Sequence, residues 1–316
     1  MKAQALNRSY ELSLNEKRIE PKKAKKVISP WRIIIYAILI LYTIWILAPF
    51  VIILVTSFTS NAEYMDATNY IWWPKNFTFE NYKRLFMDDP FAVDGIPSLL
   101  RGFINTMWIT LIPLFSGLFQ SLLVAYCYWQ YDFPGKKKLF MINATLMFIP
   151  VGSFSFVSYM FYQNIGWTEG IKAFFPLFVP GLFASAGTVF FLRPYLDSIN
   201  KEIVEAARID GMNFWQIFFS IVVPLSKPAL IAQFIFGFVG GYNNYSGALL
   251  YLLDQSETMW TLQLSMQQLI SYLSVSQDDF GFQCATALMA MLPLIILYLF
   301  CQRFFIEGIS FGGGKE

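Results

Sequence analysis

The sequence contains no histidine, and charged residues make up only 14% of its 316 residues. The side chain most used for metal sites, proton relays and catalytic triads is therefore absent, so these kinds of site have no support. A net charge of +2 also gives no basic surface of the kind that binds nucleic acid. Soluble domains usually contain about 25% charged residues, so the low charge and the 56% hydrophobic content together predict a membrane protein.

Cysteine is scarce as well, and the three cysteines show no CxxC spacing (Cys127, Cys284 and Cys301). Neither a disulfide framework nor a zinc site is expected. No segment matches G-x-x-x-x-G-K-[ST], and the nearest glycine-lysine pair, Gly135-Lys136, has none of the other elements of a P-loop. We therefore expect this chain to bind no cofactor or metal and not to hold ATP in the manner of a P-loop.

The apolar residues fall into six segments, each close to the ~20 residues that cross a bilayer. They are 33–57, 99–126, 139–161, 173–195, 229–252 and 283–305. The first follows a long polar segment and has no small-residue cleavage site, so it is predicted to be a retained anchor. The expected fold is an all-α membrane protein with six transmembrane helices.

Lysine and arginine predict the orientation, because they are enriched in cytoplasmic loops. They cluster at 22–32, 136–138 and 193–227 and are absent between 228 and 302. Both termini are therefore predicted to be cytoplasmic.

The predicted organisation has five regions. A basic cytoplasmic extension (1–31) precedes the first transmembrane helix (32–57) and an external loop (58–98). A transmembrane core (99–306) contains a cytoplasmic loop (198–228), and a cytoplasmic tail (307–316) ends the chain. In the external loop, Thr78, Glu80 and Asn81 predict a short interfacial helix through Leu85, which either caps the bundle or contacts a partner.

The cytoplasmic loop predicts a helix–turn–helix knob. Asn200 is a candidate cap for a helix that ends at Gly211, since glycine favours the left-handed C-terminal cap. Asn213 and Gln216 have capping-box spacing for a second helix, which Pro224 limits.

This knob contains many large apolar side chains for a cytoplasmic segment: Ile203, Val204, Phe214, Trp215, Phe218 and Phe219. Two interpretations stay open. The side chains either pack on the protein's own helices or form a socket for a partner.

The same loop resembles the EAA loop of ABC importer permeases, whose pattern is EAA-x3-G-x9-I-x-L-P. The matching residues are Glu205, Ala206, Ala207, Gly211, Ile221 and Pro224. Only the leucine differs, and Val223 replaces it. The resemblance implies a type I importer (MetI-like) fold in a bacterial or archaeal cytoplasmic membrane.

Three further segments, at 131–136, 260–264 and 302–315, are similar to the sugar-importing branch, in particular to the second membrane subunit of maltose-type systems. The sequence departs from many relatives at 242–245, where they have tryptophan and an acidic residue. The resemblance implies four kinds of partner: a homologous second permease, two ATPase subunits that hold ATP and Mg, an external sugar-binding protein and the lipid bilayer.

In this family the EAA loop couples the permease to the ATPase. The resemblance assigns that role to Glu205, Ala206, Ala207, Arg208, Asp210, Gly211 and Pro224. The family's tail also reaches the ATPase, which makes Gly312 and Lys315 candidates for a second contact.

Polar residues at membrane depth are candidates for the translocation path: Asn105, Asn143, Tyr242, Asn243, Asn244 and Tyr245. Buried amides are costly in lipid, so these residues either bond between helices or face a water-filled cavity. An ion-coupled transporter or channel subunit is the alternative function, and a membrane enzyme is a further one. The first would need charged residues inside the spans, and the second would need a catalytic cluster that we do not find.

Overall fold

The computed structural model describes residues 30–60, 62–63, 73–149, 151–273 and 279–312, without the side chains of 151, 153 and 303–312. Contacts divide the chain into two units, of which the first ends at Val51 and the second begins at Ile52. Helix α2 (Pro30–Ser57) continues from the first unit into the second. In the first unit, every described side chain of α2 is exposed. A long helix that is apolar all round and has no protein cover belongs in lipid.

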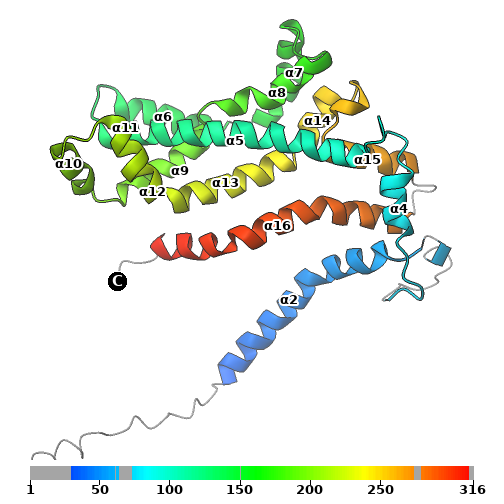
Figure 1. Cartoon of the computed structure of the whole chain (residues 1–316). Helices are drawn as coiled ribbons and strands as arrows, with labels where there is room; N and C mark the ends of the chain where they lie inside the picture. Colours follow the sequence, from blue (N-terminus) through cyan, green and yellow to red (C-terminus); the bar gives the residue numbers. More distant parts are fainter. Residues whose placement is uncertain (1–29, 61, 64–72, 150, 274–278, 313–316) are drawn as a thin grey trace, which may run out of the picture. The chain divides into compact units, whose positions relative to one another are not determined.

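The second unit is built around α5 (Ser98–Gln130). With 33 residues and a rise of 1.5 Å per residue, α5 is about 50 Å long. It packs against α9 (Ala186–Asp197), α13 (Lys227–Tyr242) and α15 (Leu262–Leu273). Helix α6 (Lys136–Met147) packs on α9, and α16 (Phe280–Gly312) packs on α13, α15 and α4 (Glu80–Met87) (Figure 1).

The two ends of α5 carry different structures. Its start contacts α15 and the turn η5 (Glu257–Met259), close to α4, and we call this the α4 end. Its last turns pack with residues of α10 (Glu202–Ile209) and α11 (Phe214–Ile217), and we call this the α10 end (Figure 1).

Short elements make up the rest of the second unit. They are η1 (Val151–Phe154), α7 (Ser155–Asn164), η2 (Gly170–Phe174), α8 (Phe175–Phe178), η3 (Pro180–Leu182), η4 (Phe218–Val222), α12 (Val223–Leu225) and α14 (Tyr245–Leu252). The described residues form helices and turns, with only an isolated bridge between Val93 and Ile96. The prediction of an all-α protein is therefore confirmed.

Three described helices are long and apolar enough to cross a membrane: Pro30–Ser57, Ser98–Gln130 and Phe280–Gln302. They coincide with the first, second and sixth predicted spans. Two more spans are possible as bent pairs, Gly170–Phe178 with Pro180–Asp197 at 41°, and Phe214–Leu225 with Lys227–Tyr242 at 72°.

The remaining predicted span, 139–161, is not one continuous helix. It falls on α6 and α7, which are separated by η1. The sequence places Pro150 and Gly152 between the two helices, and both residue types weaken a helix interior. Hydropathy detected the apolar segment but could not detect its interruption. The predicted fifth span is likewise divided between α13 and α14 at Asn243 and Asn244.

The helix boundaries also differ from the predicted regions at the C-terminus. Helix α16 runs to Gly312, so helix continues beyond residue 306, where the core was predicted to end. The division of the sequence into cytoplasmic and external regions stays a prediction.

Helix α5 approaches the backbone of the α8–α9 segment so closely that one position requires glycine. A Cβ atom on Gly117 would lie 2.7 Å from the carbonyl oxygen of Gly181 and 3.1 Å from that of Phe183. Backbone atoms cannot move aside as a flexible side chain can. This contact therefore fixes the distance between α5 and the segment that leads into α9.

We expect Gly117→Ala to lower the free energy of unfolding by about 1–3 kcal/mol, because the added methyl group overpacks the contact. The matched control is Gly240→Ala in α13, where a Cβ would meet no atom within 4 Å. The control should be neutral or stabilising by up to about 1 kcal/mol, through helix propensity. Thermal unfolding in detergent measures both, and equal midpoints for the two variants would contradict the close approach.

Candidate functional site

The knob predicted from the sequence is present at the α10 end. The Asn200 side-chain oxygen accepts a hydrogen bond from the Glu202 backbone N–H at 3.0 Å, so Asn200 satisfies one of the free donors at the start of α10. Lys201 is the N-cap residue by backbone geometry, one position later than predicted.

Helix α10 ends in a Schellman motif. Gly211 has a φ of 83°, in the left-handed region. The Met212 N–H donates to the Ala207 carbonyl at 3.0 Å, and the Gly211 N–H donates to the Arg208 carbonyl at 3.0 Å. These are the two bonds that define the motif. The prediction that Gly211 ends the helix is confirmed, and the chain reverses here within two residues.

The second helix of the knob begins with a complete capping box. The Asn213 side chain accepts from the Gln216 N–H at 2.9 Å, and the Gln216 side chain accepts from the Asn213 N–H at 2.8 Å. The helix then passes through a π-helical turn, η4, into α12. The 72° bend into α13 begins after Leu225, one residue beyond Pro224, which was predicted to limit this helix.

The inner side of the knob is part of the protein core. Val204 and Ala207 of α10 lie in one buried cluster with Tyr126 and Trp129 of α5 and Phe218 of the π-helical turn. The Tyr126 ring lies 5.8 Å from the Phe218 ring. The apolar contacts thus hold α10 firmly on the last turns of α5.

Two cations on the knob also contact aromatic rings. The Arg208 guanidinium lies 5.4 Å from the Tyr131 ring centre, and the Lys201 ammonium lies 5.9 Å from the Trp129 ring centre. Exposed contacts of this kind contribute about 0.5–1 kcal/mol each. They orient side chains at the edge of the knob.

The outer side of the knob is apolar and uncovered. Ile209 is 87% exposed, and Ile203, Trp215 and Phe219 are about half exposed. Packing on the protein's own helices is confirmed for Val204 and Phe218, which are buried, whereas Ile203, Trp215 and Phe219 are exposed. A socket for a partner at these exposed side chains stays a prediction. Sequence reasoning missed Ile209, although its position four residues after Glu205 on one helix face could have revealed it.

The seven predicted coupling residues occupy different environments. Glu205, Ala206, Arg208, Asp210, Gly211 and Pro224 are exposed, and Ala207 is buried. Glu205, Ala206 and Ile209 thus form an exposed patch on α10, which we call the α10 patch. Of the predicted tail contacts, Gly312 is the last residue of α16 and Lys315 lies outside the described residues.

Three of the six predicted path residues bond between helices. Asn105 donates to the carbonyls of Thr258 and Trp260, both at 2.9 Å. Asn143 donates to the Ala186 carbonyl at 3.1 Å, and the Tyr242 hydroxyl donates to the Ala290 carbonyl at 2.9 Å. Each side chain thus donates a hydrogen bond to a backbone carbonyl of another segment, as expected for amides and hydroxyls in an apolar medium.

The other three lie at the break between α13 and α14. Asn244 accepts from the Gly247 N–H at 3.1 Å and so caps α14, while Tyr245 is half-buried. Asn243 is exposed. Among the described residues, no hydrogen bond joins 242–245 to Asn105 or Asn143. The six predicted path residues therefore lie at separate places in the structure.

A hollow of about 480 Å³ lies beside the middle of α5. It contains none of the predicted path residues. Its lining includes Thr110, Pro113 and Gly117 of α5, Gly181 and Ser185 near the start of α9, and Gly237 and Gly241 of α13. No sequence signal separated these small residues from ordinary close-packing positions.

The sequence from residue 22 to residue 310 matches the family described as "Binding-protein-dependent transport system inner membrane component". The chain belongs to this family. It is thus a membrane permease component and not itself an enzyme, and the resemblance that rested on the EAA loop is confirmed.

The match between this permease and its curated relatives covers nearly the whole length of each relative. The arabinooligosaccharides transport permease AraQ of Halalkalibacterium halodurans is 28% identical over 84% of this chain and 90% of its own. The melibiose/raffinose/stachyose import permease MelC of Bacillus subtilis (strain 168) is 31% identical, over 84% and 91%. The maltodextrin permease MdxG of the same organism is 28% identical, over 90% and 96%.

A solved structure confirms the permease fold. A chain of a bacterial ABC transporter involved in the import of alginate matches with a TM-score of 0.73. It is 23% identical, and the match covers 87% of this chain and 96% of that one. The type I importer fold expected from the sequence is therefore confirmed.

We expect Asn213→Ala to destabilise the knob by about 1 kcal/mol, since it removes the side-chain cap of α11. Asn213→Asp keeps an acceptor oxygen and serves as the matched control. Amide hydrogen exchange of residues 214–217 measures the effect. Unchanged protection in the alanine variant would show that the capping box does not hold this helix.

Asn105→Leu removes the donor to two carbonyls and should cost about 1–3 kcal/mol of unfolding free energy. Asn243→Ala, at an exposed amide, should change it by no more than about 0.5 kcal/mol. Thermal unfolding of the two variants separates a bonding role from a path-lining role. A stable Asn105→Leu permease with altered uptake would contradict the bonding role.

Proposed function

We propose that this chain is one of two channel-forming subunits of an ATP-driven importer for a sugar or oligosaccharide. An external binding protein delivers the sugar, and separate subunits hydrolyse ATP. The observation that carries the proposal is the α10 patch, an exposed surface of Glu205, Ala206 and Ile209 on a helix whose opposite side, at Val204 and Ala207, is buried in the core. The names of the relatives, which transport arabinooligosaccharides, maltodextrin and melibiose or raffinose, support an oligosaccharide as substrate.

The proposed orientation places the α10 end in the cytoplasm. Three positively charged segments lie at or next to this end: Lys136 to Lys138 at the start of α6, Arg193 to Arg208 around α10, and Lys227 at the start of α13. Basic residues favour the cytoplasmic side. Both chain termini then lie inside, and the α4 end faces outward.

In the proposed complex, the α10 patch docks in a cleft of an ATPase subunit. Ile209 and Ile203 would lose exposed apolar surface there, at about 25 cal/mol per Å² buried. The Glu205 carboxylate is exposed next to them and is free to accept a charge-assisted hydrogen bond from the partner. Arg208 and Asp210 would lie at the rim of this contact.

Coupling follows from how α10 is attached. Because Val204 and Ala207 are packed with Tyr126 and Trp129, a displacement of α10 displaces the end of α5. Helix α5 crosses the whole unit, so a movement of the ATPase subunits would reach the α4 end as a rigid-body rotation. ATP and Mg would be held entirely by the partner subunits.

The proposed translocation path lies on the side of the hollow beside α5. Thr110 and Ser185 give this hollow polar groups among small residues. A homologous second permease would provide the opposite wall. Asn243 and Asn244, at the break between α13 and α14, are the polar candidates nearest to the α4 end of α13.

The test is Ala206→Trp, which adds bulk to the α10 patch at an exposed position and leaves the buried Ala207 unchanged. We expect loss of co-purification with the ATPase subunits and at least about tenfold lower uptake, equivalent to about 1.4 kcal/mol or more of lost coupling. The matched control is Ala206→Ser, which should retain both co-purification with the ATPase subunits and uptake. Full uptake by an assembled Ala206→Trp complex would contradict docking at this patch.

A further inference from the structure

Helix α4 has two different faces. Asn81 and Leu85 are buried, and Arg84 is largely covered. On the opposite face, Phe79 is 70% exposed, Phe86 is 39% exposed and Met87 is 75% exposed, with Lys83 between them. These four residues, spaced i, i+4, i+7 and i+8, form one side of a helix, which we call the α4 stripe.

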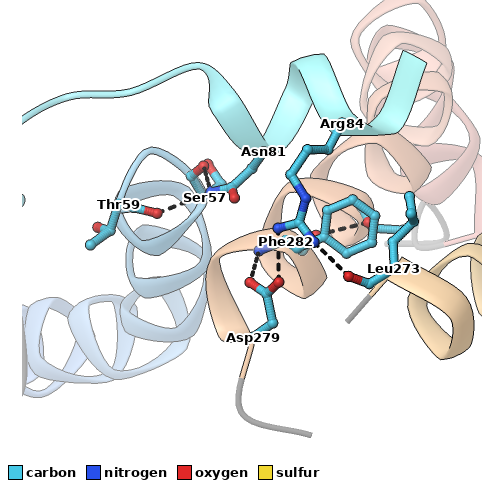
Figure 2. A network of polar contacts seen from close by, with 8 residues as sticks. Ser57, Thr59, Asn81, Arg84, Leu273, Asp279 and Phe282 are labelled. Carbon is cyan, nitrogen blue, oxygen red and sulfur yellow. Dashed lines mark hydrogen bonds and ion pairs between the residues drawn. The ribbon is translucent and has the colours of Figure 1, made fainter. Parts of the chain in front are cut away.

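The buried face of α4 is bonded to the end of α2. The Asn81 side-chain amide donates to the carbonyls of Ser57 at 2.9 Å and Thr59 at 3.0 Å (Figure 2). The Tyr82 hydroxyl donates to the Ser57 hydroxyl oxygen at 2.8 Å. These bonds place α4 where α2, a membrane-crossing helix, stops.

The same face is bonded to the start of α16 by a buried ion pair. Arg84 donates to the Asp279 carboxylate at 2.8 Å and to the Leu273 carbonyl at 2.5 Å, and its guanidinium lies over the Phe282 ring at 4.7 Å (Figure 2). Asp279 is fully buried, and it also accepts from the Phe282 N–H at 3.3 Å. Helix α16 also crosses the membrane by length and composition, and its start lies beside α4.

The two sets of bonds define the level of α4 in the membrane. Helices that cross a bilayer end near its surface, so a helix tied to the end of one and the start of another lies at that surface. The bonded face is turned toward the protein, and the α4 stripe is therefore turned away from it, at the level of the lipid headgroups.

The stripe is continuous with an apolar groove between two membrane-crossing helices. Phe86 also lines an apolar groove of about 450 Å³ between α5 and α16. The walls of this groove include Leu99 and Leu100 of α5 and Leu292 and Ile296 of α16, and Leu100, Leu292 and Ile296 are exposed. A surface for a water-soluble partner has no reason to merge with the lipid-facing side of two membrane helices.

The chemistry of the stripe and its surroundings also fits an interface. Trp73 is 68% exposed and packs edge-to-face on Phe77 at 5.2 Å, just before α4. Phe79 packs on Phe58, next to the end of α2, at 5.4 Å. Tryptophan is enriched at the membrane–water boundary, and helices that lie in this boundary carry Phe and other apolar side chains on one face. Lysine there extends its ammonium toward the headgroups.

We propose that the α4 stripe is a phospholipid-contact surface in which Phe79, Phe86 and Met87 enter the headgroup region of the leaflet at the α4 end and Lys83 meets the lipid phosphates. In the proposed orientation this is the outer leaflet. The lipid contact itself does not depend on the ATPase contact of α10. The two proposals can therefore fail separately.

The test uses single spin labels on the assembled importer in nanodiscs of phosphatidylethanolamine and phosphatidylglycerol. The native cysteines are replaced by alanine, and this background must retain uptake. Labels are placed at Met87→Cys and Lys83→Cys. Two matched sites calibrate the depth: Ile296→Cys on the exposed side of α16, and Glu257→Cys on the exposed turn η5. Collision rates are measured with oxygen, which concentrates in lipid, and with a water-soluble nickel chelate.

We expect the ratio of oxygen to nickel collisions to fall in the order Ile296, Met87, Lys83 and Glu257, with Met87 severalfold above Glu257. A ratio at Met87 equal to that at Glu257 would place the stripe in water and overturn the proposal. Low collision rates with both reagents at Met87 would show that a protein covers the stripe, and would overturn it as well. Repeating the measurement without the binding protein shows whether the covering protein is the binding protein or another subunit.

Discussion

The buried cluster shared by α10 and the last turns of α5 is the contact on which the position of the knob depends. Val204 and Ala207 lie in one buried cluster with Tyr126 and Trp129, and a Schellman motif at Gly211 ends α10. The knob is therefore joined to the end of α5 and is not a separate appendage. In the proposed complex, a surface built in this way would transmit a displacement, because well-packed side chains have low compressibility.

The membrane adds a second constraint, since backbone groups in lipid must find partners within the protein. In the described residues, Ser116, Gln120 and Ser121 of α5 bond backbone groups of residues 182 and 185, where the helical chain is interrupted. Asn143 does the same at the start of α9. Polar side chains on one helix thus complete the hydrogen bonds that a break in another leaves open.

The parts that sequence could predict are those governed by local chemistry. The capping box at Asn213, the left-handed cap at Gly211 and the short helix through Leu85 each depend on a few neighbouring residues, and each is present. The family also followed from a local pattern. The interruption of 139–161 and the bend after residue 225 change the direction of apolar segments, and hydropathy reports length but not direction.

The contacts that could not be predicted join residues far apart in the sequence. Asn105 bonds carbonyls more than 150 positions away, and Thr110 and Gly241 meet only because α5 packs on α13. A single sequence contains the amide but not its partner. For the same reason the polar residues at membrane depth were divided between two interpretations.

The ion pair between Arg84 and Asp279 has a consequence for how this protein can change over generations. Removing one member of a buried pair typically costs about 3–5 kcal/mol, whereas replacing both by apolar side chains is often neutral. Asp279 is fully buried, and its partner comes from a helix almost 200 residues earlier in the chain. Substitution at one position alone is therefore selected against, and the two positions are expected to be inherited as a unit.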